Sequence, residues 1–134
     1  MNLYIQDCIE DIKLKSKGYI DMKVSAQAKY VRISPTKLNR IVKELIGLKV
    51  DEAIKLLSFL PHRGSDVLQK VVKSAKSNAE HNYNLKPDYL VISEGYVGQA
   101  GIMKRFRAMS KGRAGLIQKK ISHVTIIVKE EGSH

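Results

Sequence analysis

A basic segment in the last third of the chain reads Met103-Lys104-Arg105-Phe106-Arg107-Ala108-Met109-Ser110-Lys111-Gly112-Arg113-Ala114-Gly115. Strand-like runs flank it at residues 89–97 and 121–128. Between Gly95 and Glu130 the chain has eight Lys and Arg residues and no acidic residue. A connection this long in a compact domain is usually functional or disordered. Its uniform positive charge predicts that a polyanion binds the whole connection between the two strand-like runs, which we call the finger.

The finger offers several groups suited to nucleic acid. Guanidinium forks match phosphate oxygens, and their planes stack on unpaired bases. Phe106 is available for stacking, and Gly98, Gly101, Gly112 and Gly115 permit close approach of the backbone. The alternative is a solvated loop that binds nothing. The finger's cations are Lys104, Arg105, Arg107, Lys111, Arg113, Lys119 and Lys120.

Length and composition indicate one basic domain. The chain has 134 residues, a net charge of +11 and an isoelectric point of about 9.8. An anionic partner would offset the self-repulsion, with nucleic acid as the first candidate and an anionic membrane surface as the second. One cysteine, Cys8, permits no internal disulfide. Residues 1–22 are expected to be an N-terminal extension, poorly structured or a short helix, and residues 23–134 the domain.

The sequence patterns predict an α+β fold in the order β-α-α-α-β-β. Ser34 is expected to cap the first helix with Pro35 in its first turn, and Gly47 to end it in a left-handed cap. Ala53, Leu56, Leu57 and Leu60 are expected to form the buried face of the second helix. We expect a three-stranded antiparallel sheet with the helices on one face. The predicted elements are a strand at 27–33, helices at 35–46, 51–60 and 65–83, and strands at 89–97 and 121–128.

A second basic cluster stands at the predicted start of the first helix. Free N–H groups and a positive dipole end favour a phosphate there. The alternative is an ordinary solvated helix face, which we prefer for the lysines of the third helix. The candidate residues of this cluster are Arg32, Ser34, Lys37 and Arg40.

Catalysis has little support in the sequence. His62, His81, His123 and His134 form no metal-binding or catalytic spacing, and no phosphate-binding loop or nucleophile elbow is present. His123 is expected to be a structural residue or an RNA contact. We therefore predict no enzyme activity, no cofactor, no metal site and no small-molecule substrate.

Four stretches in order give the chain a resemblance to a known family over residues 24–130. The chain resembles the large-subunit ribosomal protein family numbered twenty-two, in its bacterial and organellar form. The stretches are Lys29-Tyr30-Val31-Arg32-Ile33-Ser34-Pro35-Thr36-Lys37, Val72 to Asn82, Lys104 to Arg107 with Lys111 to Ala114, and Ser122 to Val128.

The resemblance implies an α+β body near the exit of the nascent-peptide tunnel and a finger that is a long protruding β-hairpin, at about 96–122. It implies binding to large-subunit rRNA, contacts with neighbouring ribosomal proteins, a role in subunit assembly and a hairpin tip that lines the tunnel. The family usually has Gly-Pro where this chain has Ala100-Gly101, and Pro-Arg-Ala where it has Ala108-Met109-Ser110. The expected tunnel-lining residues are Arg107, Ala108, Met109, Ser110 and Lys111.

We therefore expect a structural rRNA-binding protein whose finger orders on contact with RNA, because it has no apolar core of its own. The alternative is a free-standing basic nucleic-acid-binding module such as a regulator, which would read half-sites as a dimer. No membrane association is expected. The ribosome would be bacterial or organellar, and the Lys- and Ile-rich composition favours a plastid over a mitochondrion.

Overall fold

The computed structural model describes residues 22–131. Their order matches the predicted β-α-α-α-β-β sequence of elements, with a 3₁₀ turn at Pro87–Tyr89 before the second strand. The predicted extension at 1–22 falls, except for Met22, outside the described residues. The elements are β1 (Lys23–Val31), α2 (Pro35–Leu45), α3 (Val50–Phe59), α4 (Arg63–Tyr83), β2 (Leu90–Ala108) and β3 (Ala114–Glu130).

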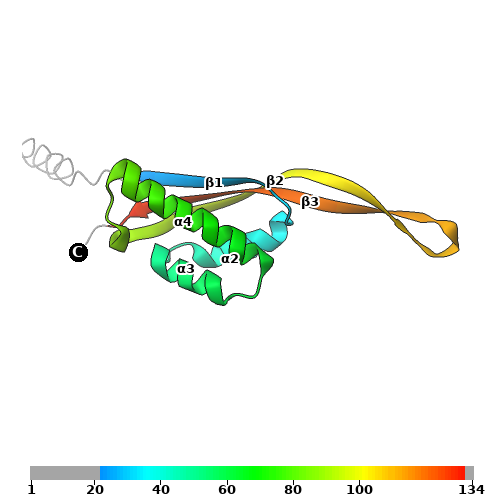
Figure 1. The fold of residues 1–134 in the computed structure, drawn as a ribbon, viewed down its shortest axis with the longest axis horizontal. Helices are drawn as coiled ribbons and strands as arrows, with labels where there is room; N and C mark the ends of the chain where they lie inside the picture. The colour runs from blue at the N-terminus through cyan, green and yellow to red at the C-terminus, as the bar shows by residue number, and fades with distance from the viewer. Residues whose placement is uncertain (1–21, 132–134) are drawn as a thin grey trace, which may run out of the picture.

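The three strands form one antiparallel sheet in the order β1-β3-β2. β1 covers only the inner part of β3, where Lys23 pairs with Lys129 and Val31 with Ser122. β2 and β3 continue past β1 and past the helices as a two-stranded arm (Figure 1). The finger is therefore the long β-hairpin that the resemblance implied. The strand predictions of 89–97 and 121–128 were too short, because apolar alternation fades where the hairpin leaves the core.

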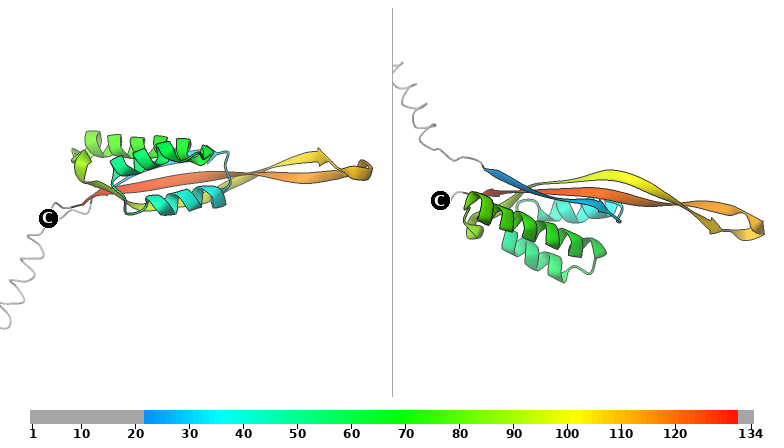
Figure 2. Two further views of the ribbon diagram at one scale, coloured as in Figure 1. Left: turned by 90° about the horizontal axis from the view of Figure 1, so that it is seen from below. Right: turned by 45° about the horizontal axis from the view of Figure 1, so that its top comes forward.

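All three helices lie on one face of the sheet, as predicted (Figure 2). α4 packs against β1 and β3, α2 packs against β2 and β3, and α3 packs against α4. Alternate strand residues point into this core, in keeping with the two-residue period of a pleated strand. The buried strand residues are Val24, Ala26, Leu90, Ile92, Val124, Ile126 and Val128.

The helix faces follow the predicted periodicity except in the second helix, where Leu60, predicted for its buried face, follows the end of α3 and is half-buried. Leu38, Ile41, Val42 and Leu45 of α2 are buried, as is the stripe of α4 from Leu68 to Ala79. Leu56 of α3 is 36% exposed, and Phe59 is 86% exposed. The prediction that Leu56 is buried was wrong, because α3 contacts the rest of the core mainly through α4 and buries only a narrow face.

Both predicted caps of α2 need correction. The Ser34 side chain makes no capping hydrogen bond, and the Ser34 carbonyl accepts from the N–H of Lys37 at 3.1 Å instead. Gly47 does have a positive φ of 88°. Its N–H, however, donates to the Ile92 carbonyl at 2.8 Å rather than to a helix carbonyl. The chain thus leaves α2 by joining β2, which ties the helix to the sheet.

Two bulges in β2 change which residues face the helices. The register shifts between Ile92 and Glu94, and again between Gln99 and Gly101. After the first shift, Gly95 pairs with the buried Ile126 and lies beneath α2. A Cβ at Gly95 would overlap the Cγ1 methyl of Val42. Gly95 is therefore a point of close approach between α2 and the sheet.

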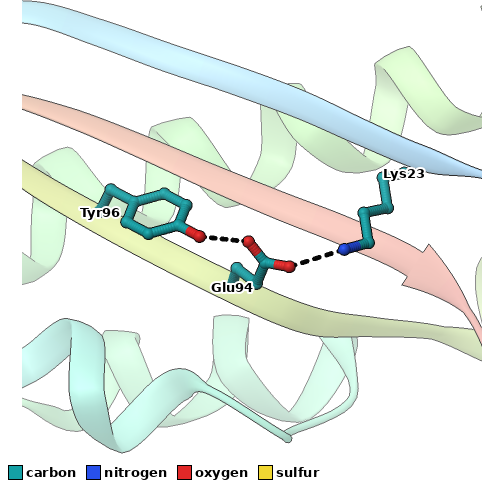
Figure 3. A network of polar contacts seen from close by, with 3 residues as sticks. All are labelled: Lys23, Glu94 and Tyr96. Carbon is teal, nitrogen blue, oxygen red and sulfur yellow. Dashed lines mark hydrogen bonds and ion pairs between the residues drawn. The ribbon is translucent and has the colours of Figure 1, made fainter.

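The face of the sheet without helices carries a small polar network (Figure 3). Lys23 Nζ lies 2.7 Å from Glu94 Oε1, and the Tyr96 hydroxyl donates to Glu94 Oε2. The hydrogen bond from Lys23 and then that from Tyr96 lower the pKa of Glu94 below its ordinary value of 4.5. The hydrogen bond to Glu94 raises the pKa of Tyr96 above 10.0. The network therefore links the start of β1 to the body part of β2 across β3.

The substitution Glu94→Gln is expected to remove a small, pH-dependent part of the stability. Because the pKa of Glu94 is lowered on folding, its contribution is present above pH 4.5 and is lost as pH falls through the folded-state value. Because the pKa of Tyr96 is raised, its contribution is present below pH 10.0 and is lost as pH rises through its folded-state value. Urea unfolding of the parent and of the Glu94→Gln variant at acid, neutral and alkaline pH measures the difference in their free energies of unfolding. This difference is small because the groups are exposed.

Tyr96→Phe is the matched comparison, since it should weaken but not abolish the stability change at acid pH, where Lys23 still acts on Glu94, and should abolish the change at alkaline pH. A stability difference between the Glu94→Gln variant and the parent that stays constant through pH 4.5 would contradict the network.

Candidate nucleic-acid interface

A groove of about 900 Å³ lies where the hairpin leaves the body. It is bounded by the start of α2, the start of α4 and the base of the hairpin. The two basic clusters predicted separately from the sequence thus face one common space. Its lining residues are Arg32, Ile33, Ser34, Thr36, Lys37, Arg40, Ile41, Pro61, His62, Arg63, Gly64, Met103, Arg105, Lys119 and Lys120.

The start of α2 is fixed against the root of the hairpin. Ser122, which is fully buried on β3, donates its hydroxyl hydrogen to the Ile33 carbonyl at 2.5 Å. The Ile33 N–H donates to the Val31 carbonyl at 2.8 Å, which turns the chain sharply out of β1. These bonds place Arg32 and Ser34 beside the hairpin.

The start of α4 is fixed against α2 by a glycine. A Cβ at Gly64 would lie 3.1 Å from both Ile41 Cδ1 and Leu38 Cδ2, so the backbone of α4 approaches α2 closely here. Arg63 and His62 are thereby placed on the groove. The N-termini of two helices, α2 and α4, therefore line the same groove, and each contributes the positive end of its dipole.

The groove is strongly cationic. Seven of its lining residues are Lys or Arg, and none of the described residues that line it is acidic. Like charges gathered in one concave surface raise the local potential and attract a polyanion. The seven are Arg32, Lys37, Arg40, Arg63, Arg105, Lys119 and Lys120.

The groove unites half of the predicted site residues and leaves the others along the hairpin. Arg32, Ser34, Lys37, Arg40, Arg105, Lys119 and Lys120 line it. Lys104 lies on β2 between the groove residues Met103 and Arg105, and Phe106, Arg107, Lys111, Gly112 and Arg113 lie farther out on the hairpin. Phe106 is 80% exposed and pairs with the exposed Leu116. The outer hairpin thus presents both cations and apolar side chains to its surroundings.

The tip is a short loop closed by the pairing of Ala108 with Ala114. The Met109 N–H donates to the Arg113 carbonyl at 2.8 Å, and Lys111 and Gly112 have φ values of 59° and 68°. The Met109 side chain folds back over Gly115, where a Cβ would overlap it. The expected tunnel-lining residues therefore occupy the outermost part of the arm.

His123 lies outside the groove, on β3 at the root of the hairpin. Its Nδ1 accepts a hydrogen bond of 3.1 Å from the N–H of Tyr30. The expectation of a structural role for this residue is met by that bond, and its expected RNA contact stays a prediction.

Sequence reasoning missed Arg63 and His62 as members of the site. The predicted third helix began at Ser65, so both residues stood in an apparent turn. A basic pair in a turn resembles any solvated turn, and only the packing of Gly64 on α2 brings it to the groove. The acid-free run Pro61-His62-Arg63-Gly64 was the one available signal.

Residues 22–131 contain no group of three or more His, Cys, Asp or Glu side chains that could hold a metal ion. Within the same range, no helix has the length and apolar character needed to cross a membrane.

Comparison with known proteins shows to which family this chain belongs. Residues 26–129 match the family described as ribosomal protein L22p/L17e. "Large ribosomal subunit protein uL22" of Finegoldia magna is 49% identical over 109 residues, which are 81% of this chain and 97% of that protein. The proteins of the same name from Oceanobacillus iheyensis and Halothermothrix orenii are 46% and 41% identical over 110 residues, 82% of this chain and 97% of each relative. This chain therefore belongs to the ribosomal protein L22p/L17e family.

Proposed function

We propose that this protein is a structural constituent of the large ribosomal subunit and binds large-subunit rRNA through the groove and the hairpin. The observation that carries the proposal is the groove, where seven cations and two helix N-termini face one space. The relatives' shared name, large ribosomal subunit protein uL22, supports the same role. Family membership also supports the prediction that the protein is not an enzyme.

The mechanism is electrostatic and geometric. Phosphates of one RNA segment occupy the groove, where Arg forks and helix N–H groups receive them. The hairpin enters a crevice between RNA segments. Its cations neutralise phosphates, and its exposed apolar residues, such as Phe106 and Leu116, pack against bases and sugars. The RNA thereby supplies the packing that the arm lacks in the free protein.

The hairpin tip extends this proposal to the nascent-peptide tunnel. Arg107, Ala108, Met109, Ser110 and Lys111 would line the tunnel wall, because the arm holds them at the greatest reach from the body. By joining RNA segments near its tip to those at its groove, the protein would support subunit assembly.

Neighbouring large-subunit proteins are the other proposed partners. The relatives compared above are bacterial, which supports a bacterial ribosome as the site of action. They give no support to a plastid over a mitochondrion.

Sedimentation of a gentle cell lysate tests the proposed function. The protein is expected to migrate with the large subunit at low salt and to remain with it at high salt. Salt weakens the individual phosphate contacts, but a hairpin enclosed by RNA can leave only if the surrounding RNA opens. Migration as a free small protein, or with DNA, would contradict the proposal and favour the free-standing nucleic-acid-binding module.

A further inference from the structure

An exposed aromatic pair stands at the junction of body and hairpin. The rings of Tyr30 and His123 meet edge to face, with centroids 4.8 Å apart and an interplanar angle of 83°. Tyr30 is 69% exposed, although its ring is held in place by this contact. The pair therefore offers a fixed aromatic surface to solvent.

The backbone at Tyr30 is held in an unusual conformation. The register of β1 shifts between Ala28 and Val31, and within this bulge Tyr30 has a φ of 56°. A positive φ is uncommon for a bulky residue and is a strained conformation. Gly or Asn would occupy the position at lower cost. The backbone conformation of the bulge therefore does not explain why the residue is a tyrosine. Backbone strain of this kind often marks a functional position.

The hydrogen bond from the Tyr30 N–H also determines which imidazole nitrogen of His123 carries the proton. Because Nδ1 accepts the Tyr30 N–H at 3.1 Å, the imidazole carries its proton on Nε2 while this bond is made. The pair thus combines an aromatic surface with one hydrogen-bond donor, Nε2–H.

The space beside the pair is open. Gly98 of β2 stands directly opposite His123 in the sheet, and a Cβ at Gly98 would meet nothing within 4 Å. Packing within the described protein thus does not require a glycine at this position. Its missing side chain leaves room for a flat group beside the imidazole.

The surroundings favour a nucleotide as that flat group. Arg32 follows Tyr30 by two residues, and Lys120 precedes His123 by three on β3. Both of these cations line the basic groove. The groove therefore begins two residues after Tyr30 and three residues before His123 along the chain, so RNA held at these cations would be near the aromatic pair.

We propose that Tyr30 and His123 form a stacking platform for one unpaired RNA base, next to the phosphates held in the groove. This inference rests on the proposed rRNA binding and adds a base contact to it. The base stacks on the exposed Tyr30 ring, and a ring nitrogen or carbonyl oxygen accepts from His123 Nε2–H. Gly98 leaves the space that the base enters.

Tyr30→Asn removes the aromatic ring that would stack on the base but is expected to leave the fold intact. Asn tolerates a positive φ and keeps the backbone N–H that binds His123. The full chain is titrated with protein-free large-subunit rRNA over a range of salt. The expected result is unchanged or higher thermal stability and an affinity lower on the order of tenfold, as for one lost stacked base. The salt dependence of log K should not change, because no phosphate contact is lost. Tyr30→Phe keeps the ring and is expected to bind like the parent.

Ultraviolet crosslinking of the parent complex provides a second readout, with Tyr30 expected to crosslink to an unpaired nucleotide. Parent-like binding by Tyr30→Asn would overturn the platform, and so would crosslinking of Tyr30 to a neighbouring protein in assembled subunits. If Tyr30→Asn binds normally while Arg105→Glu does not, the platform fails and the proposed function stands. If the parent chain does not bind rRNA, both fail.

Discussion

Arg105→Glu lowers the affinity for large-subunit rRNA by at least about tenfold at physiological salt and weakens incorporation into the subunit. Arg105 lines the groove from the hairpin side, and its guanidinium donates to the Lys104 carbonyl at 2.8 Å. A glutamate there would form ion pairs with the other groove cations and repel phosphate. The slope of log K against log salt should become shallower by about one or more, because at least one phosphate contact is lost. Filter binding at several salt concentrations measures both quantities.

Two variants with the same change in net charge are the controls. Lys55→Glu alters an exposed residue of α3 outside the groove and is expected to leave the salt slope unchanged. Arg113→Glu places the change in the tip loop, and it should weaken incorporation into the subunit more than it weakens binding of isolated rRNA. Equal behaviour of Arg105→Glu and Lys55→Glu would show that net charge alone governs binding, against the proposed groove.

Gly95→Val destabilises the body by about 3 kcal/mol, at the upper end of the usual range for overpacking. Strand propensity alone favours valine over glycine. At Gly95, however, even a Cβ would overlap Val42 Cγ1, so either the Val42 side chain or α2 itself must shift. Urea unfolding monitored by circular dichroism measures the loss.

Gly98→Val is the matched control, since a Cβ there meets nothing within 4 Å. It is expected to unfold at the same urea concentration as the parent or higher. Adding Val42→Ala to Gly95→Val should restore part of the lost stability, because the two sites then couple. A Gly95→Val protein as stable as the parent would contradict the close approach of α2.

Much of the fold could be predicted because its signals are local. Ser34-Pro35 marks the start of α2, and the apolar stripe from Leu68 to Ala79 follows α4 for several turns. The alternation of Val124, Ile126 and Val128 predicts the inner face of β3. The resemblance, rather than the residue pattern, supplied the hairpin.

The features of the fold and of the site that could not be predicted depend on contacts between residues that are far apart in the sequence. The bulges near Ser93 and Ala100 change which residues of β2 point toward the helices, and no short sequence pattern predicts these bulges. Gly95 appears in the sequence as one more glycine, and only the position of Val42 gives it a role. The two basic clusters could be listed separately, but Ser122 bonding to Ile33 and Gly64 packing on α2 bring them together with Arg63.

The strand order β1-β3-β2 also has a consequence for biosynthesis. β3 is the last of the described strands to be translated, yet it is the central one, and β1 and β2 pair with it and not with each other. While β3 is still being made, the helices can form but the sheet cannot. The nascent chain must hold Val24 and Ile92 without their partners until residues 121–130 emerge. Productive folding of the sheet therefore waits until residues 121–130 have been made, when β1 and β2 can both pair with β3.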